Sequence, residues 1–131
     1  MSNKQIIAVY GSLRSGMGNH RLLENAEFLC RTVTSEPYAM YSLGGFPKVS
    51  LHGDKVAPIV VELYSCNEDT MRSLDRLEGF RGEGMDNFYD RSTVQTECGK
   101  NALIYHIESG NGSNPVESGD WVEYRQSNMG S

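Results

Sequence analysis

A glycine-rich polar loop follows a short apolar run near the start of the chain. Residues 6–9 are four consecutive apolar residues, typical of a buried strand, and Tyr10-Gly11-Ser12-Leu13 leads from them into the polar stretch 14–19. Because glycine adopts backbone angles that point successive amide N–H groups in one direction, this loop is suited to holding an anion, or the negative charge that develops during a reaction. A strand-to-loop turn with no ligand is the alternative that these residues leave open.

The loop lacks the side chains of three familiar motifs. For a phosphate-binding loop, Met17 stands where the lysine is needed and Gly18 where the Ser or Thr that holds magnesium is needed. No third glycine follows Gly16 and Gly18 at the offset of a dinucleotide fingerprint. A nucleophile elbow needs a glycine two residues before its serine and another two residues after it, and Ser12 has neither. The absent lysine argues against a phosphate-ligand sensor, an interpretation that a nucleotide-binding assay would test.

A second candidate for chemistry is Glu78, near the end of a predicted helix. The apolar residues Met71, Leu74 and Leu77 recur every three positions and predict the face that packs on a sheet. At about 100° per residue Glu78 falls inside that stripe, whereas Asp75 lies well off its centre. A carboxyl group among apolar groups has its proton affinity moved toward neutral pH, as a general acid/base requires. The alternative is that Glu78 turns to solvent or pairs with Arg76, Arg81 or Arg91.

Composition and charge limit the possible classes of protein. The 131 residues predict one domain with a hydrophobic core of its own. The net charge of -5, without long runs of either sign, argues against nucleic acid and anionic membranes as partners. No signal peptide is recognisable and no stretch approaches the ~20 apolar residues of a membrane span, so we expect a cytoplasmic protein.

The cysteines and histidines show no metal-binding pattern. Three cysteines are widely separated and lack any C-x-x-C pair, which predicts free thiols, and the three histidines have no metal-ligand spacing. We therefore expect no metal site and no cofactor. The residues concerned are Cys30, Cys66, Cys98, His20, His52 and His106.

Short strands dominate the rest of the chain. Asn19 is expected to cap a short helix that reaches Glu24, and Asn67 and Gly79 to bound a second helix over 68–78. Strands are predicted within 31–42, at 56–64, 89–96 and 102–107, and at 121–124, before a flexible tail at 126–131. Residues 43–49 are predicted as a turn leading into a short extended piece, and residues 109–115 as a loop. This pattern predicts an α+β fold, a small mixed β-barrel or strongly curled sheet with two short helices.

Two motifs in order resemble the gamma-glutamylcyclotransferase superfamily, in the branch of AIG2-like and gamma-glutamylamine cyclotransferase proteins. Residues 10–13 are similar to its Y-G-[ST]-L signature, and residues 74–80, Leu-Asp-Arg-Leu-Glu-Gly-Phe, to its L-D-x-x-E-G motif. Weaker similarities follow the family order at 45–47, 61–64, 88–91 and 119–121. The resemblance covers about residues 6–125, within one domain that we expect to span residues 1–131.

The resemblance implies a chemistry and a site. In this family the α-amine of a gamma-glutamyl group attacks its own side-chain carbonyl, which gives 5-oxoproline and releases an amine or amino acid. Carried over by position, the catalytic glutamate is Glu78 and the substrate-binding loop is Tyr10, Gly11, Ser12 and Leu13. We expect Tyr89 and Tyr10 to line the pocket, with plain core packing as the alternative for each.

The neighbouring residues leave alternatives open. Ser12 is not expected to be a nucleophile, because the substrate carries its own, and Arg14 either meets a substrate carboxylate or is a solvated loop residue. The glycine-rich loop 79–88 is expected to shape the pocket for the leaving group, which could be an amino acid, a polyamine-like amine, a protein-derived lysine or an antibiotic precursor. The competing hypothesis for the whole chain is a binding or regulatory module that keeps the cavity without catalysis.

Overall fold

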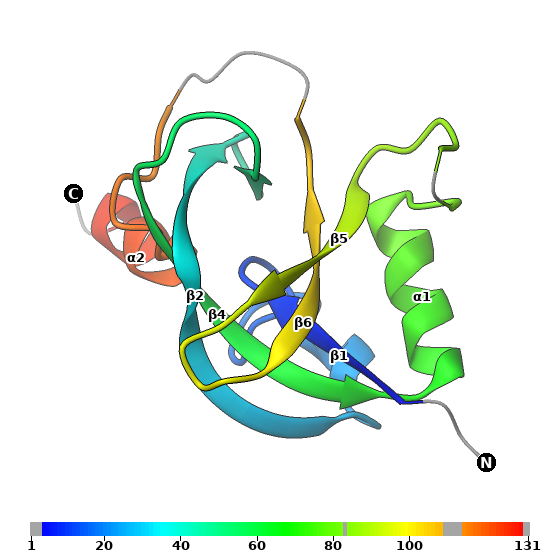
Figure 1. Cartoon of the computed structure of the whole chain (residues 1–131). Coiled ribbons are helices and arrows are strands. Elements are labelled where there is room, and N and C mark those ends of the chain that lie inside the picture. Colours follow the sequence, from blue (N-terminus) through cyan, green and yellow to red (C-terminus); the bar gives the residue numbers. More distant parts are fainter. Residues whose placement is uncertain (1–3, 83, 109–113, 130–131) are drawn as a thin grey trace.

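A computed structural model describes residues 4–82, 84–108 and 114–129. The elements in chain order are β1 (Gln5–Val9), the 3-10 helix η1 (His20–Leu23), β2 (Glu27–Ser42), β3 (Pro47–Ser50), β4 (Ala57–Cys66), α1 (Glu68–Glu78), β5 (Asp90–Gln95), β6 (Asn101–His106) and α2 (Trp121–Met129). Figure 1 shows the sheet curling around its own interior with α1 along one side. The predicted fold class, a curled mixed sheet with two helices, is confirmed.

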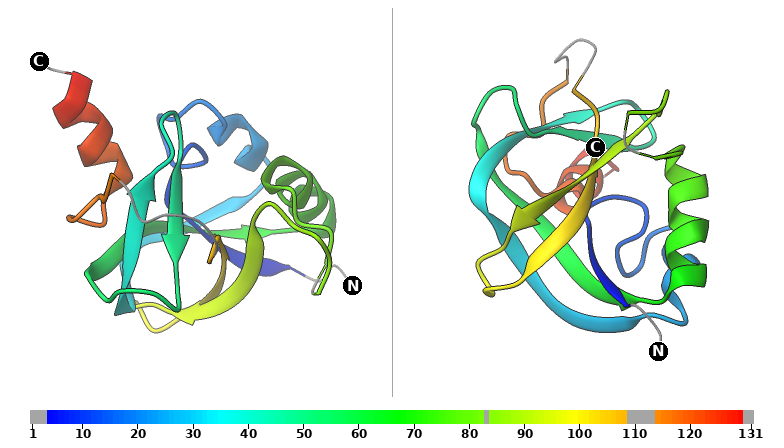
Figure 2. Two further views of the ribbon diagram at one scale, coloured as in Figure 1. Left: turned by 90° about the horizontal axis from the view of Figure 1, so that it is seen from above. Right: turned by 45° about the vertical axis from the view of Figure 1, so that its right-hand side comes forward.

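The sheet has six strands in the order β3-β2-β4-β1-β6-β5. All neighbours are antiparallel except β1 and β6, which are parallel. The curl brings the end of β5 back to β2, where Thr34 bridges Thr96 and the Glu97 amide donates to the Val33 carbonyl oxygen over 2.9 Å. Figure 2 shows the two further views of this curl.

The long strand β2 makes the curl possible. It pairs with β3 at one end and with β4 along most of its length, and its register against β4 shifts between Val33 and Pro37. Such irregularities bend a strand and increase its twist. Pro37 therefore lies at a bend within a paired strand.

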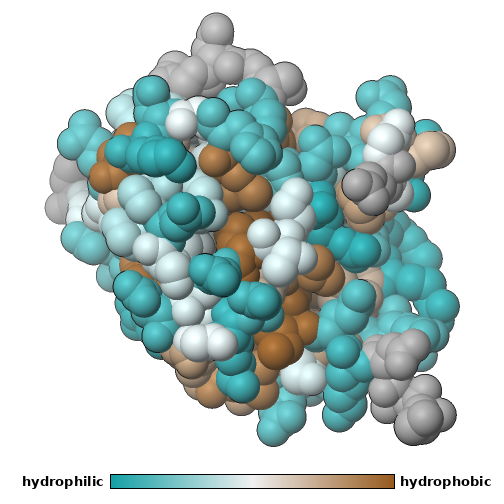
Figure 3. All heavy atoms as spheres, in the orientation of Figure 1, coloured by the Kyte–Doolittle hydropathy of each residue, from teal (hydrophilic) through white to brown (hydrophobic). Residues whose placement is uncertain are grey.

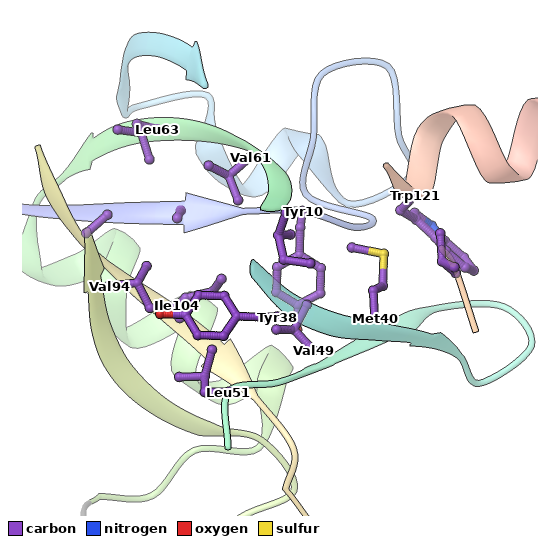
Figure 4. Close-up of a cluster of buried hydrophobic side chains, with 14 residues drawn as sticks. Tyr10, Tyr38, Met40, Val49, Leu51, Val61, Leu63, Val94, Ile104 and Trp121 are labelled. Carbon is purple, nitrogen blue, oxygen red and sulfur yellow. The ribbon is translucent and has the colours of Figure 1, made fainter. Parts of the chain in front are cut away.

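Two apolar clusters pack on opposite faces of β1, because alternate residues of a strand point to opposite sides. Ala8 and Tyr10 face the interior of the curl, where the side chains in Figure 4 meet, including Met40, Val49 and Trp121. Ile7 and Val9 face the other way, toward residues of α1 and η1. On the face shown in Figure 3, hydrophilic residues lie around a band of hydrophobic residues.

The prediction of a strand at 121–124 was wrong. These residues begin α2, which continues to Met129, so the expected flexible tail is helical over 126–129. Asp120 explains the helix, because its carboxylate accepts a hydrogen bond from the Glu123 amide and its carbonyl oxygen accepts one from Tyr124. Trp121 is buried and stacks on Tyr124, so the apolar spacing is helical rather than extended.

Other local expectations have mixed outcomes. Asn67 caps α1 through the Thr70 amide, and Gly79 ends it with φ 71°, both as predicted. Asn19 precedes η1 but makes no capping bond, because its side-chain amide donates to Ser12 Oγ. Glu83 in loop 79–88, residues 109–113 of the predicted loop and residues 130–131 of the tail lie outside the described residues.

Candidate active site

One cavity of about 310 Å³ opens beside the end of β1. It lies between the loop after β1, the last turn of α1, the start of β3 and the residues before β5. All six residues that the sequence singled out for a site border it: Tyr10, Gly11, Ser12, Leu13, Glu78 and Tyr89. The fold therefore brings together two motifs that lie about 65 residues apart in the sequence.

The loop after β1 is held by its own backbone. The Arg14 amide donates to the Gly11 carbonyl oxygen over 3.0 Å, and the Asn19 amide donates to the Ser12 carbonyl oxygen over 2.8 Å. The amides of Gly11, Ser12 and Leu13 have no acceptor within the described part of the chain. The loop thus presents unpaired N–H donors at the cavity, as an anion or a developing oxyanion requires.

Gly11 also has a steric role. A Cβ atom built at this position would lie 2.9 Å from Cγ of Pro47. The loop after β1 and the first residue of β3 therefore approach each other more closely than a larger side chain would permit.

Glu78 is the last residue of α1 and borders the cavity from the opposite side. Its carbonyl oxygen accepts from the Tyr89 amide over 3.1 Å, and the Gly79 carbonyl oxygen accepts from the Phe88 amide over 3.0 Å. These two bonds close loop 79–88 at its base and fix the end of the helix next to Tyr89.

The Glu78 carboxyl group has no hydrogen bond or ion pair with any described residue. Burial raises its pKa to about 7. None of the arginines considered as partners pairs with it, since Arg91 binds Asp75 instead. The inward direction expected from the helical projection is the one observed, and a carboxyl group with this pKa exchanges a proton readily at neutral pH.

Asp75 is a residue whose importance the sequence argument missed. Nη1 of Arg91 donates to both of its carboxylate oxygens over 2.8 Å, and the Tyr105 hydroxyl donates to one of them over 2.7 Å. The Arg91 guanidinium also lies 4.6 Å from the centre of the Phe80 ring. This network connects α1 to β5 and β6 one turn before Glu78. The aspartate of the L-D-x-x-E-G motif was the feature of the sequence that could have pointed to Asp75.

Leu77 corrects a prediction about the same helix. Met71 and Leu74 are buried as expected, but Leu77 is 44% exposed and borders the cavity rather than packing on the sheet. The last turn of α1 extends beyond the sheet face, so residues 77 and 78 meet the cavity instead.

The tyrosines around the cavity are neutral hydrogen-bond donors. The Tyr10 hydroxyl donates to the Tyr105 carbonyl oxygen over 2.6 Å, and the Tyr89 hydroxyl donates to the Pro47 carbonyl oxygen over 2.5 Å. Burial, together with nearby Glu78, raises the pKa of both phenols. Each tyrosine is buried and also borders the cavity, so core packing and pocket lining hold for the same side chain.

Arg14 is neither solvated nor in the cavity. It is buried, with Nε 3.1 Å from a Glu62 carboxylate oxygen and Nη1 2.8 Å from one of Asp120. The Ser15 amide and the Tyr64 hydroxyl also donate to Glu62. Arg14 therefore anchors the loop after β1 to β4 and to the start of α2, and neither expectation for it was right.

The fold and the cavity define a small α+β domain whose cavity lies between a loop with unpaired backbone N–H groups and one carboxyl group. Residues 7–123 match the family model described as gamma-glutamyl cyclotransferase, AIG2-like. The chain belongs to this family of gamma-glutamylcyclotransferase-like enzymes.

Individual relatives agree with that assignment. YtfP of Escherichia coli K12, named a gamma-glutamylcyclotransferase family protein, is 32% identical over 122 residues, covering 89% of this chain and 96% of its own. A Niallia circulans protein named gamma-L-glutamyl-butirosin B gamma-glutamyl cyclotransferase is 30% identical, covering 89% of this chain and 75% of its own. The crystal structure of an uncharacterized Pyrococcus horikoshii protein matches with a TM-score of 0.75 and 27% identity, over 95% and 96% of the two chains. No described helix is long and apolar enough to cross a membrane.

Proposed function

We propose that this protein converts a gamma-glutamyl amine or peptide into 5-oxoproline and a free amine or amino acid, with Glu78 as the general acid/base. The observation that carries the proposal is a carboxyl group that borders the cavity, has no partner among the described residues, and has a pKa raised to about 7 by burial. A binding module would gain nothing from leaving such a carboxyl group unpaired at its ligand site.

The reaction needs a base more than it needs a nucleophile. The substrate α-amine and the side-chain carbonyl carbon lie on one short tether, so holding the correct conformer supplies most of the advantage of proximity. A protonated amine has no lone pair, so a proton must leave it before the new C–N bond forms. Glu78 accepts that proton and returns it to the departing nitrogen as the original C–N bond breaks, so that no water or cofactor is consumed.

The loop after β1 supplies the opposite side of the site. The N–H groups of Gly11, Ser12 and Leu13 are suited either to the oxyanion of the tetrahedral intermediate or to the α-carboxylate of the substrate. The Ser12 hydroxyl accepts a hydrogen bond from the Asn19 side chain over 2.9 Å, which supports a role in ordering the loop rather than in attack. Tyr89 contributes to the wall beside Glu78.

The Niallia circulans relative supports the substrate class, since its name describes a cyclotransferase that acts on the gamma-glutamyl group of gamma-L-glutamyl-butirosin B. The test is to incubate the purified protein with a panel of gamma-glutamyl compounds and to measure 5-oxoproline. Glu78→Gln should abolish most of the product, whereas Glu68→Gln, the same change at the exposed first residue of α1, should not. Equal rates for Glu78→Gln and the parent would refute the assignment of Glu78, and no product from any compound would favour the binding module.

A further inference from the structure

We propose that the mouth of the cavity is a binding site for an uncharged aromatic or branched aliphatic leaving group, and that Phe46, Leu77 and Phe88 select it. This inference rests on the proposed function, because it concerns the part of the substrate that departs as an amine. It names the class of amine that the family assignment leaves open.

Large apolar side chains surround the entrance from three different segments. Phe46, in the turn before β3, is 40% exposed, Leu77 at the end of α1 is 44% exposed, and Phe88 before β5 is 58% exposed. All three border the cavity. The rings of Phe46 and Phe88 lie 6.2 Å apart between centroids, and Phe88 meets Tyr89 edge to face at 5.2 Å. Exposed apolar groups that converge on one cavity mark a surface that a ligand covers.

The position of Glu78 places the leaving group at this rim. The gamma-glutamyl head must reach the N–H groups at residues 11–13, and its departing nitrogen must lie beside the Glu78 carboxyl group. Leu77 precedes Glu78 on the helix. The hydrogen bonds at the base of loop 79–88 hold Phe88 next to the end of the same helix. A group attached to that nitrogen therefore extends past Leu77 and Phe88.

The charged side chains at the cavity argue against an amino acid or a polyamine as the leaving group. Among the fifteen described residues that line it, Glu78 is the sole charged side chain. None of the described lining residues carries a cation that could hold the carboxylate of an amino acid leaving group, and Arg91 is engaged by Asp75. Glu78 is also the one carboxylate among the described lining residues, so the extra ammonium groups of a polyamine would lack a partner there, and burying an unpaired charge is costly.

The test compares four amides of gamma-linked glutamate: the methylamide, the phenethylamide, the amide with glycine and the amide with putrescine. We expect the phenethylamide to have the highest kcat/KM, about 10-fold or more above the methylamide, from burial of one ring. Phe46→Ala combined with Phe88→Ala should lower kcat/KM for the phenethylamide about 10-fold to 100-fold, and by a factor at least about 10 times larger than for the methylamide. Met85→Ala is the control, because Met85 is 57% exposed in the same loop and does not border the cavity.

The outcomes separate this inference from the proposed function. If no amide yields 5-oxoproline, the proposed function fails. If the methylamide reacts but the glycine or putrescine amide reacts as well as the phenethylamide, the inference about the rim fails alone. It also fails if the double substitution changes the elution volume in gel filtration but not the substrate preference, since the phenylalanines would then serve contacts between copies.

An independent observation concerns two thiols far from the cavity. Sγ of Cys30 on β2 lies 3.2 Å from Sγ of Cys98 in the turn between β5 and β6. Backbone pairing fixes these segments next to each other, through the bond from the Glu97 amide to Val33 and the bridge between Thr34 and Thr96. Cys98 is exposed and Cys30 is partly exposed. Hydrogen bonds from Thr96 and Cys30, together with Lys100, lower the pKa of the Cys98 thiol.

We propose that Cys30 and Cys98 form a reversible disulfide that fastens β5 and β6 to β2 when the protein meets a peroxide. The Cys98 thiolate attacks one peroxide oxygen and becomes a sulfenic acid, and the other oxygen leaves as water. The Cys30 sulfur then attacks Cys98 and displaces a second water as the S–S bond forms. Two thiols lose two electrons and two protons in total, and one hydrogen peroxide becomes two waters.

The test treats the protein with hydrogen peroxide and analyses it by mass spectrometry. We expect a loss of about 2 Da, a peptide linking Cys30 to Cys98, and a rise in Tm of about 5 °C or more that dithiothreitol reverses, because the crosslink closes a long chain segment. Cys66→Ser should retain the linkage, since Cys66 is buried and its thiol pKa is raised to about 12, and Cys30→Ser should lose it. Addition of oxygen without a linked peptide would overturn this proposal.

Discussion

Glu78→Gln should make the protein more stable while removing its activity. Burial raises the pKa of the carboxyl group from 4.5 to about 7, so the folded state favours the protonated form. The folded state therefore carries no penalty from this group below about pH 4.5, and the penalty grows as the pH rises and is complete above about pH 8. A shift of that size corresponds to about 3 kcal/mol at most, and glutamine, which never ionises, avoids it.

The assay measures urea denaturation of the parent, Glu78→Gln and Glu68→Gln at pH 4.5 and pH 8. At pH 4.5 the parent and Glu78→Gln should have similar free energies of unfolding, and at pH 8 the variant should exceed the parent by about 1–3 kcal/mol. Glu68→Gln, at an exposed position, should show no such gain at pH 8. A Glu78→Gln protein that is less stable than the parent at pH 8 would show that the carboxylate has a stabilising partner and would refute the reasoning.

The same carboxyl group predicts the pH dependence of the reaction. With a pKa of about 7, the ionised fraction available as a base is about one half at pH 7 and about 1% at pH 5. We expect kcat/KM to fall about 50-fold between these pH values, and kcat to fall about 10²-fold to 10⁴-fold in Glu78→Gln. An acidic limb centred near pH 4.5 would contradict the assignment.

Three further substitutions test the supports of the site. Asp75→Ala removes the acceptor of two hydrogen-bonded side chains and should cost about 1–3 kcal/mol in urea denaturation, with a lower kcat because the end of α1 is no longer held; unchanged kinetics would show that the network does not position Glu78. Gly11→Ala places a Cβ atom 2.9 Å from Pro47 Cγ and should lower kcat/KM at least about 10-fold in the 5-oxoproline assay. Arg14→Ala leaves the buried Glu62 carboxylate without its cation and should cost about 3–5 kcal/mol of stability, so a variant that unfolds like the parent would contradict the buried ion pair.

Local signals in the sequence were sufficient for the bounds of α1. For Glu78 they left two directions open, the cavity side and a solvent-facing or paired side chain, and the structure has the first. The cap at Asn67 and the glycine at 79 act within a few residues and are realised in the structure. The helical projection holds for Met71 and Leu74 but not for Leu77. The prediction of a strand at 121–124 failed because residue types alone did not identify the helix that begins there. Residues 121–124 are rich in residue types that favour strands, but the i, i+3 spacing of Trp121 and Tyr124 is helical and Asp120 caps the helix.

The environment of Arg14 could not be predicted from local pattern. Its partners Glu62 and Asp120 lie 48 and 106 residues away in the sequence. A charged residue in a glycine-rich loop is usually solvated, and only the tertiary fold brings two carboxylates to it. The pairing of Arg91 with Asp75 likewise depends on the tertiary fold. Because Arg91 binds Asp75, it is not a partner of Glu78.

Two carboxyl groups on the last turns of α1 have opposite surroundings, and this difference explains why one of them is available for chemistry. Asp75 accepts hydrogen bonds from Arg91 and Tyr105, so its charge is compensated and it holds the helix in place. Glu78, three residues later, has no partner among the described residues and faces the cavity. Had Arg91 reached Glu78 instead, the ion pair would have kept that carboxylate ionised and lowered its affinity for the proton it must accept. By engaging Arg91, Asp75 both fixes the end of the helix and leaves Glu78 without a cation, so the two residues of the motif depend on each other.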